Sequence, residues 1–138
     1  GFDDDTHETF GQTIRFLRRN HISIASINAL TPYPGTRVFE KFKEAGRLLH
    51  EKWEFYEHHT VVFQPKNMTP LELQIGKIKA KTAFSRVWSI AERSLGNLRM
   101  PVYYLAANMG YRKLAFAENR IMRKSVSHLL PDFGKTAD

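Results

Sequence analysis

The sequence predicts an α/β arrangement that passes into a mainly α-helical region, and three observations indicate it. Residues 22–30 carry no charge and are rich in β-branched and small apolar side chains, a composition typical of a strand buried on both faces. Two prolines and a glycine follow in residues 31–36, where they would end the strand ahead of a helix. Beyond Thr69 the apolar residues recur with the spacing of long amphipathic helices.

A helix is predicted to precede the strand, since Asp5 or Thr6 can cap it and Phe10, Ile14 and Leu17 form one apolar stripe. No segment ahead of this helix has the composition of a strand that could pair with residues 22–30. Because an unsatisfied buried backbone group costs roughly 1–3 kcal/mol, we expect the neighbouring strands to lie outside this sequence. The chain is therefore interpreted as an α/β fragment from the C-terminal part of a larger protein.

After the strand, Thr36 is a suitable N-cap for a helix over 37–45, and Gly46 is placed to end that helix. Residues 47–67 show no clear periodicity. Their aromatic side chains are expected to seal the edge of the sheet, with residues 60–63 as a short edge strand.

The C-terminal half is predicted to be an αα-hairpin. Thr69, Pro70 and Glu72 make the strongest helix start in the chain, and this helix is expected to run unbroken to Gly96. Its buried side is predicted to contain Leu71, Ile75, Ile78, Thr82, Ser85 or Trp88, and Leu95. Its cations are placed around the remaining surface, at Lys77, Lys79, Lys81, Arg86 and Arg93. The second helix is predicted from near Pro101 to about Lys124, through Val102, Leu105, Met109, Leu114, Ala117 and Ile121.

Composition sets further bounds. The 138 residues include no cysteine, which excludes disulfides and thiolate-bound metal or iron–sulfur clusters within this chain. No apolar run approaches the ~20 residues of a membrane span, and a cytoplasmic setting is expected. The net charge of +7 is unevenly distributed. Residues 1–76 contain nine Lys/Arg and ten Asp/Glu, whereas residues 77–138 contain twelve Lys/Arg and four Asp/Glu. This asymmetry favours two regions, residues 1–66 and a helical domain over 67–138.

No self-contained active site is visible, so neither catalytic nor metal-ligating residues are predicted. Phosphate-binding glycine motifs and the GxSxG motif are absent. The adjacent His58 and His59 would point to opposite faces of a strand, and the Asp3–Asp5 run favours a helix start over a cation site. The loop over 31–36 is the strongest candidate for ligand contact, because it joins the end of a strand to a helix N-terminus.

The basic C-terminal half permits an alternative function, a small module that binds nucleic acid or an anionic membrane. Its cations are interleaved with aromatic side chains that could stack on bases, at Trp88, Tyr103, Tyr104 and Tyr111. The cations are dispersed around the helices and do not form a stripe, so a nucleic acid is not the favoured partner. Peripheral membrane contact is an open alternative.

Five segments of the sequence resemble, in order and spacing, the C-terminal part of radical SAM enzymes. They are GFDDDTHETF at 1–10, LTPYPGT at 30–36, EAGRLL at 44–49, WEFY at 53–56 and VFQPKNM at 62–68. The closer match is to the subgroup with a cobalamin-binding domain, which includes hopanoid methylase-like and magnesium-protoporphyrin ester cyclase-like proteins. The resemblance covers residues 1–76 and extends more loosely over the helical remainder.

The resemblance implies a partial TIM-like (β/α) barrel in which a CxxxCxxC loop holds a [4Fe-4S] cluster that cleaves S-adenosylmethionine to a radical. That loop is absent here. Residues 1–5 would end the fifth barrel strand, 22–30 would be the sixth, and 31–36 would close that side of the pocket. The predicted cofactor-binding residues are Gly1, Asn28, Ala29, Leu30, Pro34, Gly35 and Thr36.

We therefore expect the last strand–helix units of a radical SAM barrel, followed by a helical extension that covers the barrel as a lid over 71–124. The parent enzyme would be a cobalamin-dependent methyltransferase or a related enzyme acting on a C–H bond of a small-molecule or lipid-like substrate. Its main partner would be the remainder of the barrel. The isolated chain is predicted to be inactive and to bind none of these cofactors tightly.

Overall fold

The computed structural model describes the backbone of residues 1–95 and 101–133, and the side chains of 1–94 and 102–122. Its elements are α1 (His7–Arg19), α2 (Arg37–Glu44), the 3₁₀ turn η1 (Trp53–Phe55), α3 (Pro70–Phe84), α4 (Val87–Leu95) and α5 (Pro101–Phe133). The described residues form no β-strand. The predicted α/β character is thus replaced by a mainly helical architecture.

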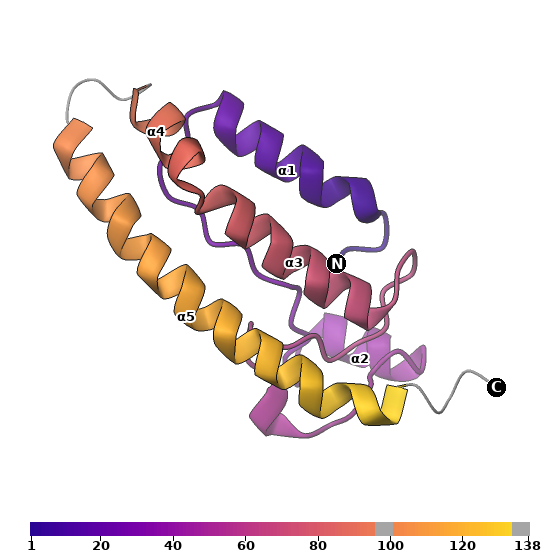
Figure 1. Ribbon diagram of the computed structural model, residues 1–138. Helices are drawn as coiled ribbons and strands as arrows, with labels where there is room; N and C mark the ends of the chain where they lie inside the picture. The colour runs from indigo at the N-terminus through magenta and orange to yellow at the C-terminus, as the bar shows by residue number, and fades with distance from the viewer. Residues whose placement is uncertain (96–100, 134–138) are drawn as a thin grey trace.

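Helix α3 lies in the middle of the molecule, with α1 along one side and α5 along the other (Figure 1). The short α4 continues beyond the end of α3 and contacts both α1 and α5. Helix α5 then runs back beside α3 in the opposite direction (Figure 1), which is the predicted αα-hairpin. The proposed division at residue 66 into two domains stays a prediction.

The strand predicted over residues 22–30 does not form. This segment is extended, but within the described chain residues 24–28 make no backbone hydrogen bond. One face of the segment is covered, with Ala29 only 7% exposed, whereas Ile22 and Ile24 on the other face are 37% and 42% exposed. An extended backbone becomes a strand only when a neighbour completes its ladder, and the described chain offers none here. The predicted edge strand over 60–63 is reduced to a single bridge between Leu48 and Phe63.

The predicted helix starts are confirmed. Thr36 Oγ1 accepts the N–H of Phe39 at 3.3 Å and caps α2. At α3, Thr69 Oγ1 accepts the N–H of Glu72 while the Glu72 carboxylate accepts the N–H of Thr69, a reciprocal capping box. Thr6 is the N-cap of α1, and its N–H donates to Thr9 Oγ1 at 3.1 Å, so its partner is Thr9 and not Glu8.

The first predicted long helix is interrupted, because α3 ends at Phe84 and α4 begins at Val87. A guanidinium group occupies the break: Arg93 Nη1 donates to the Phe84 carbonyl at 2.9 Å and to Ser89 Oγ at 3.0 Å. A carbonyl at the end of a helix lacks an intrahelical partner, and this arginine supplies one. The second predicted helix continues past Lys124 to Phe133.

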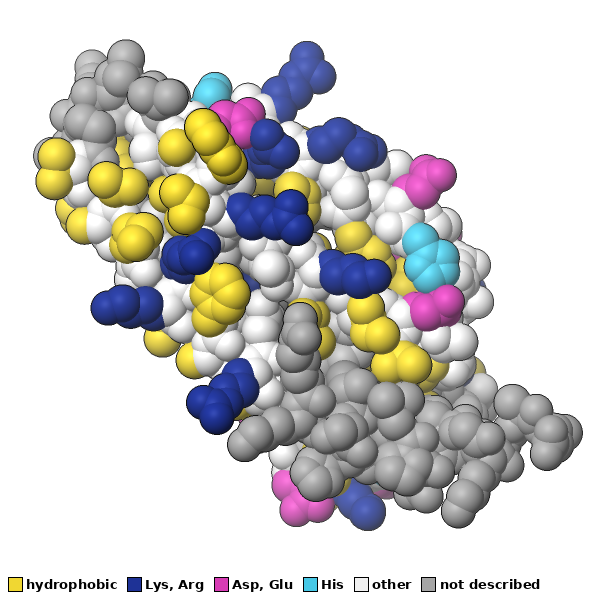
Figure 2. Space-filling view, in the orientation of Figure 1, with side chains coloured by type: hydrophobic (Ala, Val, Ile, Leu, Met, Phe, Trp, Pro, Cys, Tyr) yellow, Lys and Arg dark blue, Asp and Glu magenta, His cyan; other side chains and the backbone are white. Residues whose placement is uncertain are grey.

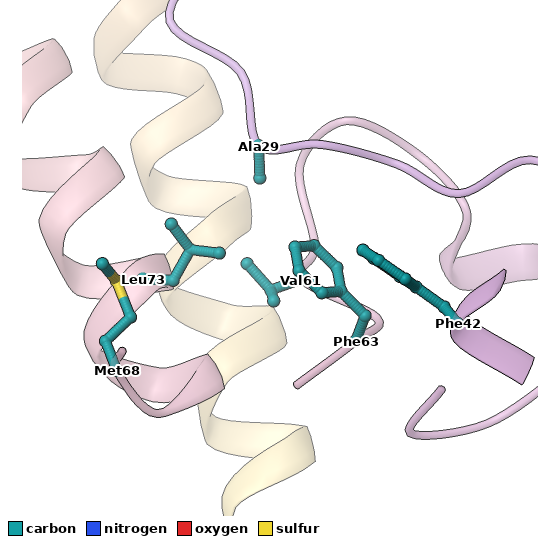
Figure 3. Close-up of a cluster of buried hydrophobic side chains, with 6 residues drawn as sticks. All are labelled: Ala29, Phe42, Val61, Phe63, Met68 and Leu73. Atoms are coloured by element: carbon teal, nitrogen blue, oxygen red, sulfur yellow. The ribbon is translucent and has the colours of Figure 1, made fainter. Parts of the chain in front are cut away.

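The main apolar core joins the extended segment to α3 (Figure 3). Its buried members are Ala29, Phe42, Val61, Phe63, Met68 and Leu73. The rings of Phe42 and Phe63 lie 4.9 Å apart, so the aromatic segment before α3 packs against α2, whereas it was predicted to seal the edge of a sheet. A second cluster of Phe39, Tyr56 and Val62 adjoins it.

Candidate functional site

A cavity of about 400 Å³ lies where the first residues of the chain, α1, residues 25–30 and α3 meet. Four of the seven predicted cofactor-binding residues line it: Gly1, Asn28, Ala29 and Leu30. Further apolar walls come from Phe10 of α1 and from Leu73 of α3. Asn28, Ala29 and Leu30 are consecutive in the sequence, and the packing of the extended segment on α3 brings them together with Gly1, Phe10 and Leu73.

The N-terminal wall of the cavity is held by a cluster of charges around Asp3. Its carboxylate accepts from Arg47 Nη1 at 2.7 Å and pairs with Lys66 at 3.0 Å. These two hydrogen-bonded cations lower the pKa of Asp3 to about 2. The amide of Asn67 donates to the carbonyl oxygens of Asp3 and Asp5 at 2.9 and 3.2 Å. The Asp3–Asp5 run therefore fixes the turn ahead of α1, and no group of three metal-binding side chains is arranged for a metal ion in the described chain.

A lysine that sequence reasoning placed on the outside lies buried at the wall of the cavity. Lys77 is 2% exposed, and its ammonium donates to the carbonyl oxygens of His58 and His59 at 2.7 and 3.0 Å. Burial lowers its pKa to about 8. The signal was present in the sequence, because Leu73 and Phe84 share the face of α3 on which Lys77 lies.

The remaining three predicted residues do not line this cavity. Thr36 is occupied in capping α2, and its hydroxyl also donates to the Tyr33 carbonyl at 2.6 Å. Gly35 has a φ of +81°, which explains a glycine in this turn without reference to a ligand. A ligand contact at Pro34, Gly35 and Thr36 stays a prediction.

The arrangement suits a small molecule with both apolar and polar parts. Phe10, Leu30 and Leu73 offer apolar surface, whereas Asn28 and Lys77 bring polar groups to the same space. A second hollow of about 620 Å³ runs between α1 and α3. It is lined mainly by apolar side chains and ends at the His7–Glu72 pair, where His7 Nε2 and a carboxylate oxygen of Glu72 lie 3.7 Å apart.

The chain is similar over part of its length to known methyltransferases. It is 33% identical over 96 residues to bacteriochlorophyllide d C-12(1)-methyltransferase of Chlorobaculum tepidum, a match that covers 70% of this chain and 21% of that protein. It is 26% identical over 121 residues to the C-8(2)-methyltransferase of the same organism, covering 88% of this chain and 27% of that protein.

An uncharacterised methyltransferase of Pyrococcus horikoshii is 35% identical over 85 residues, which are 62% of this chain and 18% of the relative. The matches thus span about a fifth to a quarter of the curated relatives. No family model matches the chain, and no solved structure matches it.

Proposed function

We propose that this chain forms the C-terminal part of a radical SAM methyltransferase and contributes one wall of its S-adenosylmethionine pocket. The observation that carries the proposal is the convergence of Gly1, Asn28, Ala29 and Leu30 on one cavity. The resemblance implies that Asn28, Ala29 and Leu30 lie by the adenine, and it places Gly1 at the end of the fifth barrel strand. The partial similarity to three methyltransferases supports the same class of reaction.

The cavity residues fit an adenosyl group. A purine presents a flat apolar face and an edge of hydrogen-bond donors and acceptors, and Leu30 and Phe10 offer apolar surface to that face. The extended backbone beside Asn28 can meet the edge, since peptide N–H and C=O groups alternate along it. S-Adenosylmethionine supplies a methyl group or, after reductive cleavage, a radical. The role of this chain is to bind and orient the adenosyl part.

An iron–sulfur cluster does not fit this chain. Such clusters are held by cysteine thiolates, and none of the 138 residues is a cysteine. The cluster ligands of the proposed enzyme therefore belong to another part of the protein. No residue of this chain is assigned to cobalamin.

The extended segment over residues 22–30 has the properties of a strand that belongs to a barrel. Residues 24–28 keep their backbone N–H and C=O groups free of hydrogen bonds within the described chain, and Ile24 exposes its side chain on the uncovered face. Strands added along both edges would satisfy the backbone, and a barrel interior or a helical layer would cover Ile24. In this proposal residues 22–30 become the sixth strand of the barrel, and α3 to α5 lie beside it as a covering layer.

The proposal is tested on the complete polypeptide that contains this chain, prepared without oxygen and with its cluster. Asn28→Trp places a bulky side chain at the cavity and should weaken S-adenosylmethionine binding, measured by equilibrium dialysis, by roughly tenfold or more. Phe16→Trp alters an exposed side chain of α1 that does not line the cavity and should leave binding unchanged. Equal binding by the Asn28 variant, or the absence of a CxxxCxxC sequence from the complete polypeptide, would overturn the proposal.

A nucleic-acid-binding module has less support. Four of the cations on which that alternative depends are turned inward or bonded to internal partners, and they are Lys77, Lys81, Arg93 and Arg112. In the part of the chain whose side chains are described, the exposed cations left for a phosphate backbone from Lys77 onward are Lys79, Arg86, Lys113 and Arg120.

A further inference from the structure

Helix α5 turns a polar stripe toward the body of the protein. Asn108 is 3% exposed and accepts from Arg93 Nη2 at 2.9 Å, and Asn119 is 6% exposed and donates to Thr82 Oγ1 at 2.8 Å. Between them Arg112 donates to the Ser85 carbonyl at 2.8 Å. Glu118 forms an ion pair with Lys81 of α3. Ala115 and Met122, 3% and 1% exposed, are buried on the same side of α5, so hydrogen bonds, a charge pair and apolar contacts together fix this face against α3 and α4.

The remaining sides of α5 are exposed, and they carry apolar side chains together with Lys113 and Arg120. We define the α5 outer face as the side chains of Val102, Leu105, Met109, Leu114, Phe116 and Ile121, all between 45% and 78% exposed. Five of these six are the apolar residues that the sequence places along this helix. Trp88 of α4, 87% exposed, is a further uncovered aromatic residue beside this hairpin. Figure 2 shows hydrophobic side chains gathered over the part of the molecule where α4 and α5 run, with Lys and Arg side chains among them.

An exposed apolar area of this kind marks a binding surface, and its charges indicate what it binds. Lys113 and Arg120 lie on the outward side of α5, and no acidic side chain lies there between residues 102 and 122. A protein partner would have to bury both cations and supply an acceptor for each, and lysine is depleted at the centre of protein interfaces. At a lipid surface the same side chains can extend to the phosphate groups while their neighbours enter the acyl region.

We propose that the α5 outer face binds the surface of an anionic lipid membrane, with α5 lying in the plane of the interface. The apolar side chains enter the boundary between headgroups and acyl chains, and Lys113 and Arg120 contact lipid phosphates. Trp88 and Tyr103 have the amphipathic rings that are enriched at this depth. No helix in the described ranges is long and apolar enough to cross the bilayer, so the contact is peripheral. The surface is independent of the cavity, and either proposal can fail alone.

Flotation with lipid vesicles tests this proposal on the complete polypeptide that contains this chain. Vesicles of phosphatidylcholine with added phosphatidylserine should carry the protein upward, and vesicles of phosphatidylcholine alone should carry much less. The double variant Lys113→Glu/Arg120→Glu should lower the partition coefficient by roughly tenfold or more, since each cation near an anionic surface contributes about 1 kcal/mol. Arg19→Glu/Arg37→Glu, two exposed cations on α1 and α2, is the matched control and should bind as the unmodified protein does.

The apolar contribution is tested by Phe116→Ser, which should weaken flotation, against Phe16→Ser on α1, which should not. Circular dichroism verifies that all variants keep their helices. The proposal is overturned if the unmodified chain does not bind anionic vesicles, or if both pairs of variants behave alike. It is also overturned if the α5 variants instead abolish a dimer seen by light scattering, because a second copy would then cover this face. Preferential binding to RNA, lost in the same variants, would assign the surface to a nucleic acid.

Discussion

Residues 22–30 and helix α5 both pack on α3, but they leave different groups uncovered. The extended segment buries Ala29 against Leu73 and leaves backbone N–H and C=O groups without partners in the described chain. Helix α5 satisfies its backbone internally and leaves apolar side chains such as Val102 and Leu114 exposed. Free peptide groups need another strand at a fixed spacing and register, whereas exposed apolar side chains need only an apolar medium.

This difference separates the two proposals. The extended segment calls for a geometrically specific neighbour, as in a barrel, and it lies beside the cavity assigned to S-adenosylmethionine. The α5 outer face calls for a surface that accepts cations and apolar groups together, as a lipid headgroup region does. Helix α3 supports both regions, since it contacts the core cluster on one side and α5 on the other.

Hydrogen exchange tests the contrast most directly and should give the largest effect. Backbone amides of residues 24–28 should exchange at least about 100-fold faster than those of 108–119 in α5, because the first group lacks hydrogen bonds and the second is held in a packed helix. Mass spectrometry of peptides from the two segments measures this ratio. Comparable protection in both would mean that residues 24–28 have found a strand partner.

A substitution at Gly76 of α3 should disrupt the packing of α1 on this helix. A methyl group at this position would come within 2.3 Å of the Phe10 ring, so Gly76→Val should force α1 away from α3 and lower the free energy of unfolding by about 2–4 kcal/mol. Gly110→Val is the matched control, since a Cβ there has nothing within 4 Å. Urea unfolding measures both. Adding Phe10→Ala to Gly76→Val should restore part of the loss, and a failure to do so would place the strain elsewhere.

The orientation of α5 is tested by two neighbouring residues. Asn108→Ala should lower the free energy of unfolding by about 2 kcal/mol, because it leaves the buried Arg93 guanidinium short of an acceptor. Met109→Ala, at a side chain 45% exposed, should change it by less than about 0.5 kcal/mol. Thermal or urea unfolding gives the comparison. The reverse order would mean that the apolar side of the helix faces the core.

The smallest expected effect is a pH dependence from Lys77. Burial lowers its pKa to about 8 in the folded chain, against 10.5 when exposed, so the folded state holds fewer protons between these values. The free energy of unfolding should therefore rise from pH 8 to 10.5, by on the order of 1 kcal/mol since two carbonyl acceptors still favour the ammonium. Urea titrations at several pH values measure the slope. Lys77→Met should remove it, whereas Lys79→Met, at an exposed position, should retain it.

The interior of the C-terminal half was the least accurate part of the sequence prediction. The predicted buried side of the first helix allowed either Ser85 or Trp88, and the structure buries Ser85 at 8% exposed and leaves Trp88 87% exposed. Lys77, Lys81 and Arg93 were placed on the remaining surface, and they are buried. Hydrophobic periodicity assumes that cations avoid the interior. Here carbonyl oxygens, Asn108 and Glu118 supply acceptors for them, and these come from segments that are distant in sequence.

The candidate site was predicted in part. Gly1, Asn28, Ala29 and Leu30 were named from the resemblance, and the structure brings them to one cavity, but their binding role awaits the experiment. Lys77 shares a face of α3 with Leu73 and Phe84, but it was missed because the sequence does not reveal its acceptors, the carbonyl groups of residues 58 and 59.

The sequence by itself determined where helices begin and where some of them end. Thr36, the Thr69–Glu72 capping box and Gly46 act through contacts that span only a few residues, so local chemistry is sufficient. Only the tertiary structure decided which side of α5 faces inward and whether residues 22–30 become a strand. The inward side of α5 depends on hydrogen-bond partners that come from segments distant in the sequence. Strand formation by residues 22–30 depends on a neighbouring backbone, which no side chain of the segment can replace.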